Sequence, residues 1–117
     1  MEASLETLEE KVRLGYLYDF YGELLNPHQR QVYENYVLND LSLSEIGEEE
    51  GISRQAAHDM ISRCTKKLKE YESRLHLLEK FLSIRGKAER IRSLAGEFTG
   101  EKAAEILGLT EEIVNSL

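Results

Sequence analysis

Hydrophobic positions recur every three or four residues along most of this chain, which is the period of an amphipathic helix. No alternating run of β-branched residues is long enough to predict a strand. We therefore predict an all-α fold. A first helix is expected over about residues 5–25. A second is expected over about residues 28–38, with Asn26 as its cap and Pro27, the single proline, at its first position.

The stretch over residues 43–61 has the spacing of a helix-turn-helix, in which two short helices cross and a glycine occupies the turn. Ser42 followed by Glu45 forms a capping box for the first helix, and Ser53 caps the second, reading helix. The predicted motif core consists of the apolar residues at the crossing and the turn glycine: Leu43, Ile46, Gly51, Ile52, Ala57 and Met60.

The apolar series of the reading helix continues in steps of four and three far beyond the motif, with no glycine or proline before Gly86. It predicts one helix from Ser53 to about Leu82, on the order of 45 Å long, which is too long for the distal half to be covered by the motif alone. Either the N-terminal helix covers this seam within the chain, or a second copy covers it in a homodimer. The seam comprises Ala57, Ile61, Cys64, Leu68, Tyr71, Leu75, Leu78 and Leu82.

The composition shifts after Gly86, so we predict a helix-turn-helix core over residues 1–85 and a small helical extension over residues 86–117. Residues 87–95 predict a short basic helix. The last segment has the spacing of a helix, a turn at Gly108 and a second short helix, which suggests a packing unit or adaptor surface.

The chain has 117 residues and a net charge of −7, whereas a protein that gains its affinity from phosphate neutralisation is usually basic over the contacting domain. Four glutamates, Glu45, Glu48, Glu49 and Glu50, lie on the helix that normally approaches the phosphate backbone. Binding of nucleic acid would therefore require a local basic patch. With one cysteine, no apolar run of membrane-spanning length and an acidic start, we expect a cytoplasmic protein that does not enter the membrane.

Groups with chemical reactivity are sparse in this sequence. His28, His58 and His76 do not combine with Cys64 at a metal-binding spacing, and Cys64 lies on the apolar seam, where a packing role is expected. The glycines that precede lysines lack the spacing of a phosphate-binding loop. We predict no enzyme activity, no catalytic residue, no metal and no cofactor.

The face of the reading helix opposite the seam is the candidate contact surface. Arginine and glutamine read base edges or bind phosphate, and the basic run after Met60 is the most concentrated in the chain, although Asp59 lies within this face and such runs are often only solvated. The candidate residues for binding nucleic acid or a partner are Arg54, Gln55, His58, Asp59, Ser62, Arg63, Lys66 and Lys69.

Residues 16–81 resemble the bacterial YlxM family, a helix-turn-helix group similar to the promoter-reading domain of sigma factors and so to the winged-helix-like DNA-binding superfamily. The most specific matches are LYDFY at residues 17–21, LxxxQR at residues 25–30, DLSLSEI at residues 40–46 and GISRQAAHD at residues 51–59. Two departures lie in the motif: Glu50 replaces an apolar residue and Gly47 replaces the usual alanine.

Members of that family lie beside genes for signal-recognition-particle components, so the resemblance implies an accessory or regulatory role in protein targeting, with the particle's protein or its RNA as partner. Two other interpretations remain open from the residues. The chain could regulate transcription by reading duplex DNA through Arg54, Gln55 and His58, or it could be a helical adaptor in which the motif is only a scaffold.

Overall fold

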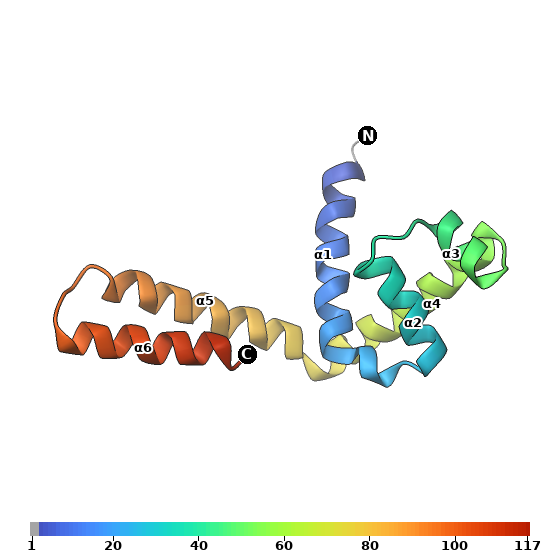
Figure 1. The fold of residues 1–117 in the computed structure, drawn as a ribbon. Coiled ribbons are helices and arrows are strands. Elements are labelled where there is room, and N and C mark those ends of the chain that lie inside the picture. The colour runs from blue at the N-terminus through green and yellow to red at the C-terminus, as the bar shows by residue number, and fades with distance from the viewer. Residues whose placement is uncertain (1–2) are drawn as a thin grey trace. The chain divides into compact units, whose positions relative to one another are not determined.

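The computed structural model describes residues 3–117, with side chains from Glu9 onward. Within these residues every regular element is helical, so the predicted all-α fold is confirmed (Figure 1). The elements are α1 (Ala3–Tyr21), the short 3-10 helix η1 (Gly22–Leu24), α2 (Pro27–Val37), α3 (Leu43–Glu50), α4 (Arg54–Leu75), α5 (Leu77–Ala95) and α6 (Glu101–Asn115). They form two compact units, one ending at His76 and one spanning Leu77–Leu117.

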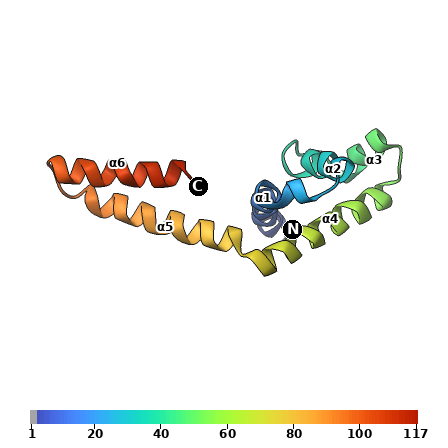
Figure 2. The ribbon, with the colours of Figure 1, turned by 90° about the horizontal axis from the view of Figure 1, so that it is seen from below.

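In the first unit α4 is the central helix, and α1, α2 and α3 all pack against it, as Figure 2 shows from one end of α1. The long reading helix therefore packs on the N-terminal helix, as the sequence predicted. Large side chains fill this core, among them Tyr33 from α2 and Leu68 from α4, both fully buried. The remaining buried apolar residues of the unit are Leu14, Leu17, Tyr21, Leu25, Val32, Ile46, Ala57, Ile61 and Cys64.

Tyrosines carry hydrogen bonds into this core. The Tyr21 hydroxyl donates to Glu72 Oε1 at 2.6 Å, which satisfies a carboxylate that is buried on α4. The Tyr33 hydroxyl bonds Thr65 Oγ1 at 2.7 Å, and the Tyr33 ring stacks on Tyr18 with centroids 6.1 Å apart. A buried polar group without a partner destabilises the fold, so these bonds fix how α1 and α2 align against α4.

The reading helix is shorter than the sequence predicted. It ends at Leu75, where His76 takes a left-handed conformation with φ of 57° and donates its backbone N–H to the Glu72 carbonyl at 2.9 Å. The prediction of a helix to about Leu82 was therefore wrong. The apolar repeat continues across this break because a single left-handed residue does not change the spacing of apolar positions in the sequence. The left-handed conformation costs a non-glycine residue only roughly 1–2 kcal/mol.

The break divides the predicted seam between two helices. Its first four members, from Ala57 to Leu68, are buried in the first unit, whereas Leu75 is about half exposed. Leu78 and Leu82 lie on α5, and Leu82 is also exposed. Gly86, where the sequence placed the division into 1–85 and 86–117, lies inside α5, and the compact units divide after His76 instead.

The second unit is a helical hairpin in which α5 and α6 run antiparallel side by side (Figures 1 and 2). The predicted basic helix over residues 87–95 is the C-terminal half of α5. The predicted turn at Gly108 was wrong, because α6 runs through it to Asn115. A single glycine costs a helix only about 1 kcal/mol, which the packing of the surrounding apolar residues offsets.

Candidate contact surface of the helix-turn-helix

The local sequence fixes the geometry of the helix-turn-helix. The Ser42 hydroxyl accepts from the Glu45 amide at 3.1 Å, and Glu45 Oε1 accepts from the Ser42 amide at 2.8 Å, as the predicted capping box requires. Gly51 has φ of 69°, which favours glycine, and Ser53 Oγ accepts from the Ala56 amide at 3.0 Å. These caps set the angle at which α4 leaves the turn.

Gly47 permits the close approach of the two helices at the turn. A Cβ atom at this position would lie 2.8 Å from the backbone carbonyl oxygen of Ile52. That same turn carries a hydrogen bond in which the Ile52 amide donates to the Gly47 carbonyl at 2.8 Å. The replacement of the family's alanine by glycine therefore has a local structural reason in this chain.

The six predicted motif-core residues lie in three environments. Ile46 and Ala57 are buried between α3 and α4, whereas Leu43, Ile52 and Met60 are partly buried around them. Gly51 is exposed in the turn. The crossing therefore has a small buried centre, and the rest of the motif lies close to solvent.

The eight predicted contact residues are all exposed on α4, but they do not form one uniform face. Gln55 Nε2 donates to Asp59 Oδ1 at 3.1 Å, and His58 Nδ1 lies 3.5 Å from the same oxygen. The Asp59 carboxylate is therefore already engaged along its own helix. Lys69 reaches back to α1, where its Nζ lies 2.9 Å from Glu10 Oε2.

Three cations of this set remain available to a partner. Within the described part of the chain, Arg54, Arg63 and Lys66 make no ion pair. All three side chains are exposed. A positive charge that is not neutralised internally is the kind that binds an external phosphate or carboxylate most effectively.

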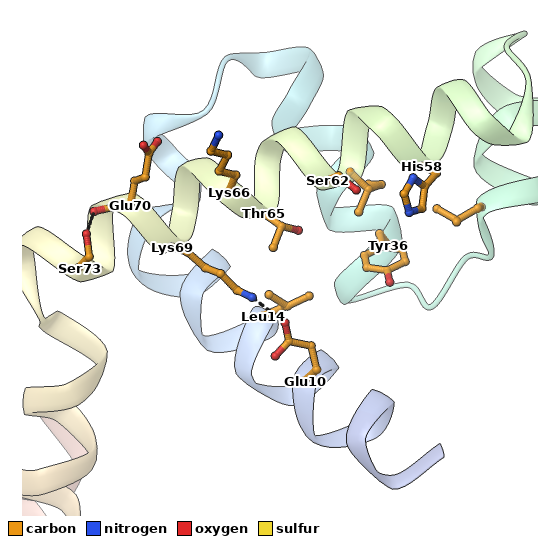
Figure 3. Close-up of a pocket in the computed structure, with 12 residues that line it drawn as sticks. Glu10, Leu14, Tyr36, His58, Ser62, Thr65, Lys66, Lys69, Glu70 and Ser73 are labelled. Atoms are coloured by element: carbon orange, nitrogen blue, oxygen red, sulfur yellow. Dashed lines mark hydrogen bonds and ion pairs between the residues drawn. The ribbon is translucent and has the colours of Figure 1, made fainter. Parts of the chain in front are cut away.

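A groove with a volume of about 600 Å³ runs along one side of α4 (Figure 3). Its apolar floor includes Leu14, Leu43 and Ile61, and Tyr36 closes the end near His58. Four of the predicted contact residues line it, namely His58, Ser62, Lys66 and Lys69. Arg54, Gln55, Asp59 and Arg63 lie outside it.

The sequence did not identify the residues that α1 and α2 contribute to this groove. Glu10 points toward Lys69 across it (Figure 3), and the Lys11 ammonium lies 4.7 Å from the centroid of the Tyr36 ring. Lys11 also pairs with Asp40 at 2.8 Å, and this hydrogen bond holds the pKa of the Asp40 carboxyl below its usual value. No local motif marks these residues, because only the packing of α1 brings them beside α4.

Buried groups beside the groove remain in their neutral forms. Burial raises the pKa of the Tyr33 phenol to about 12, so its bond to Thr65 persists across the physiological range. Burial also raises the pKa of the Cys64 thiol, which agrees with a packing cysteine rather than a nucleophile.

Acidic side chains surround the α3 end of the motif. Glu45, Glu48 and Glu49 are exposed on α3, while Glu50 pairs with His28 at 2.6 Å. A duplex phosphate backbone that approached α3 would meet these charges. The electrostatics therefore favour contact through α4 alone.

Across residues 3–117, no three His, Cys, Asp or Glu side chains gather as they would around a metal ion. Each helix described here is too short or too polar to span a bilayer.

Residues 8–103 match the sequence profile of the family UPF0122, described as "Putative helix-turn-helix protein, YlxM / p13 like". The UPF0122 protein of Geobacillus kaustophilus is 42% identical over 106 residues, which cover 91% of this chain and 96% of the relative. The Shouchella clausii protein is 40% identical over 107 residues (91% and 98%), and a Clostridium kluyveri protein is 42% identical over 100 residues (86% and 90%). No solved structure matches the chain.

Proposed function

Because this chain belongs to the UPF0122 family of YlxM/p13-like helix-turn-helix proteins, we propose that it is an accessory or regulatory protein of the signal-recognition-particle pathway. It acts without catalysis, by binding the particle's protein component or its RNA in the cytoplasm. The family resemblance supports the choice of pathway, and the exposed cations on α4 support this helix as the proposed contact surface.

The observation that carries this proposal is the separation of charge across the motif. Arg54, Arg63 and Lys66 lie exposed and without an ion pair in the described residues, whereas α3 presents glutamates. Ordinary major-groove docking brings both helices close to duplex phosphate, which the α3 glutamates oppose. A folded RNA or a protein can contact α4 while avoiding α3.

The first test is co-purification of tagged protein from its own cytoplasm, probed for the targeting GTPase and the particle RNA. The second is titration of both components with the double variant Arg63→Gln/Lys66→Gln, with Lys102→Gln as a control in the second unit. We expect the double variant to weaken binding about tenfold or more at low salt and the control to leave it unchanged. Equal affinities for the wild type and the double variant would overturn the role of this face.

Asp59→Asn distinguishes the two partners. The asparagine can keep the hydrogen bond from Gln55 but loses the negative charge. Binding to RNA phosphate should tighten because a repulsion is removed, whereas binding to a basic protein surface should loosen.

A DNA-binding transcription regulator is the second candidate, because Arg54, Gln55 and His58 are exposed at the start of α4, where a reading helix contacts bases. Sequence-selective duplex binding with a steep salt dependence would favour it over the targeting role. A chain that binds neither nucleic acid nor the targeting GTPase would instead be a helical adaptor.

A further inference from the structure

Small side chains form the seam inside the α5–α6 hairpin. Ala88, Ala95, Ala103 and Thr110 are each 8% exposed or less. The Thr110 hydroxyl is satisfied within its own helix, where it donates to the Ile106 carbonyl at 2.8 Å. Small residues allow two helices to approach closely, but they remove little apolar surface from water. The inner seam alone therefore provides a weak hydrophobic driving force.

Most large apolar side chains of the hairpin are not buried in this seam, although Leu78 at the start of α5 is 1% exposed. On each of two adjacent stripes they are 43 to 53% exposed. One stripe belongs to α5 and the other to α6, and together they form what we call the hairpin face: Ile84, Ile91, Leu94, Ile106, Leu109 and Ile113.

Helical geometry places both stripes on the same side of the hairpin. At 100° per residue, the α5 stripe lies about 30 to 110° to one side of the mean direction of Ala88 and Ala95, and the α6 stripe lies about 50 to 110° to one side of the mean direction of Ala103 and Thr110. Viewed from the N-terminus of its own helix, each stripe is rotated away from the seam in the same direction. Because α5 and α6 are antiparallel, rotation in the same direction brings both stripes to the same face of the hairpin.

The size of this face suits association. Two neighbouring helices are about 20 Å wide and α6 is roughly 22 Å long, so the face covers on the order of 400 Å². The largest apolar patch on a typical monomer has about this size and is often functional. The unit spans only 41 residues, Leu77–Leu117, near the lower limit of what forms a core without oligomerisation.

Opposite charges lie on the two helices of the face. Lys80 and Lys87 lie within the angular range of the α5 stripe and Lys102 within that of the α6 stripe, whereas Glu105 and Glu112 flank the α6 stripe on the side away from α5. A twofold axis parallel to the helices would place α5 of one copy over α6 of the other, antiparallel, so that the α5 lysines lie close to the glutamates that flank α6. Since the hairpin turns near residue 99, Lys87 and Glu112 of the two copies lie at about the same level.

We propose that the second unit is a dimerisation element, in which the hairpin faces of two copies pack into an antiparallel four-helix bundle. The large residues that one hairpin leaves exposed then form the core of the bundle. This inference goes beyond the proposed function and does not depend on it. It also differs from a dimer through the Ala57–Leu82 seam, whose first four members are already buried in the first unit.

Sedimentation velocity of the full chain, over micromolar to submillimolar concentration, tests this proposal. We expect a monomer–dimer equilibrium with a micromolar Kd, as for interfaces at the small end of the size range. A wild-type chain that stays monomeric throughout, including one that captures a different protein through this face, would overturn it.

Substitutions on the two sides of α5 supply the matched control. Ile91→Glu should abolish the dimer, whereas Leu82→Glu should not, although the two side chains are equally exposed at 43% and 42%. Leu82 lies about 160° from the centre of the α5 stripe. Circular dichroism of both variants verifies that α5 and α6 remain helical. Equal dissociation in the two variants would contradict the assignment of the face.

Charge reversal tests the arrangement of the copies. Lys87→Glu and Glu112→Lys should each raise Kd about tenfold, because two symmetric pairs change in every dimer, and the double variant should restore it. If α5 instead lay over α5, the double variant would not recover. Failure of that rescue would overturn the proposed arrangement.

Discussion

The two units of this chain distribute side-chain size in opposite ways. The first unit buries tyrosines, leucines and isoleucines around α4, and Glu72 is the one charged residue that its described part buries. The second unit buries Leu78 but otherwise only alanines and Thr110, and it exposes most of its isoleucines and leucines. A core of large residues stabilises a unit by itself, whereas a seam of small residues sets only how closely two helices approach. This contrast is the basis for our proposal that the second unit pairs with a second copy, whereas the first unit has a core of its own.

Tyrosine fluorescence separates the two units experimentally. All six tyrosines, at positions 16, 18, 21, 33, 36 and 71, lie in the first unit, and the chain has no tryptophan. Denaturation followed by tyrosine emission therefore reports the first unit, while far-UV circular dichroism reports both.

The largest effect is expected from truncation of the buried core. Leu68→Ala should lower the free energy of unfolding of the first unit by about 2–5 kcal/mol, since Leu68 is fully buried and alanine leaves a cavity. Leu109→Ala, at 53% exposure on the hairpin face, should change the free energy of unfolding of the monomeric second unit by less than about 0.5 kcal/mol. Urea titration measures the first loss by tyrosine emission and the second by far-UV circular dichroism at low protein concentration, and equal losses would remove the contrast between the units.

Within the first unit, urea titration by tyrosine emission also tests the prediction that two members of the apolar seam contribute similarly to stability. The sequence gives Leu68 and Leu75 the same place in the apolar repeat and so predicts similar losses on truncation to alanine. Leu75 is 49% exposed at the end of α4. Leu75→Ala should therefore cost well under half of the loss at Leu68.

The next largest effect concerns the buried hydrogen bond between Tyr21 and Glu72 in the first unit. Tyr21→Phe removes the hydroxyl that donates to Glu72 and should destabilise the first unit by about 1–3 kcal/mol, because a buried carboxylate loses this hydrogen bond. Tyr36→Phe is the control, since it keeps the ring beneath the Lys11 ammonium at the groove. If both variants unfold at the wild-type urea concentration, the Tyr21 bond contributes nothing to stability.

Glycine substitutions should give opposite signs in the two units. Gly51→Ala places a side chain at φ of 69° and should cost roughly 1–2 kcal/mol. Gly108→Ala lies within α6, where an added Cβ meets no atom within 4 Å, and should raise helix stability by about 0.8–1 kcal/mol. Thermal unfolding by circular dichroism follows the pair. A loss at Gly108 would mean that α6 needs a turn there after all.

The smallest effect is expected at the surface ion pair of the groove. A double-mutant cycle on Lys69→Met and Glu10→Gln should yield a coupling of about 0.2–1 kcal/mol, which decreases at high salt because both side chains are half exposed. A coupling that salt does not change would indicate that this ion pair is less accessible to water than the half-exposed side chains of Lys69 and Glu10 imply.

Much of the first unit was predictable because its signals are local. Caps at Asn26, Ser42 and Ser53 and the turn at Gly51 act over three or four residues, and each lies where the sequence predicted. The helical period identified the buried side of α4 through Leu68 for the same reason.

The geometry of the candidate contact surface was predictable only in part. Helical phase placed the eight candidate residues on the exposed side of α4, but it did not indicate that Lys69 pairs with Glu10 or that Asp59 accepts from Gln55. It also did not predict the groove, because Leu14 and Tyr36 come from helices that are distant in sequence.

The sequence by itself determined that this chain is helical, that it carries a helix-turn-helix, and which side of α4 is buried, since these depend on the spacing of neighbouring residues. Only the tertiary structure decided where α4 ends, which cations remain unpaired and on which side the hairpin exposes its large residues. A left-handed His76 leaves the apolar repeat intact, so the pattern gives no sign of it. Which cations form ion pairs, and which apolar side chains of a helix become buried, depend on which helices pack together. Contacts between residues distant in sequence leave no periodic signal along the chain.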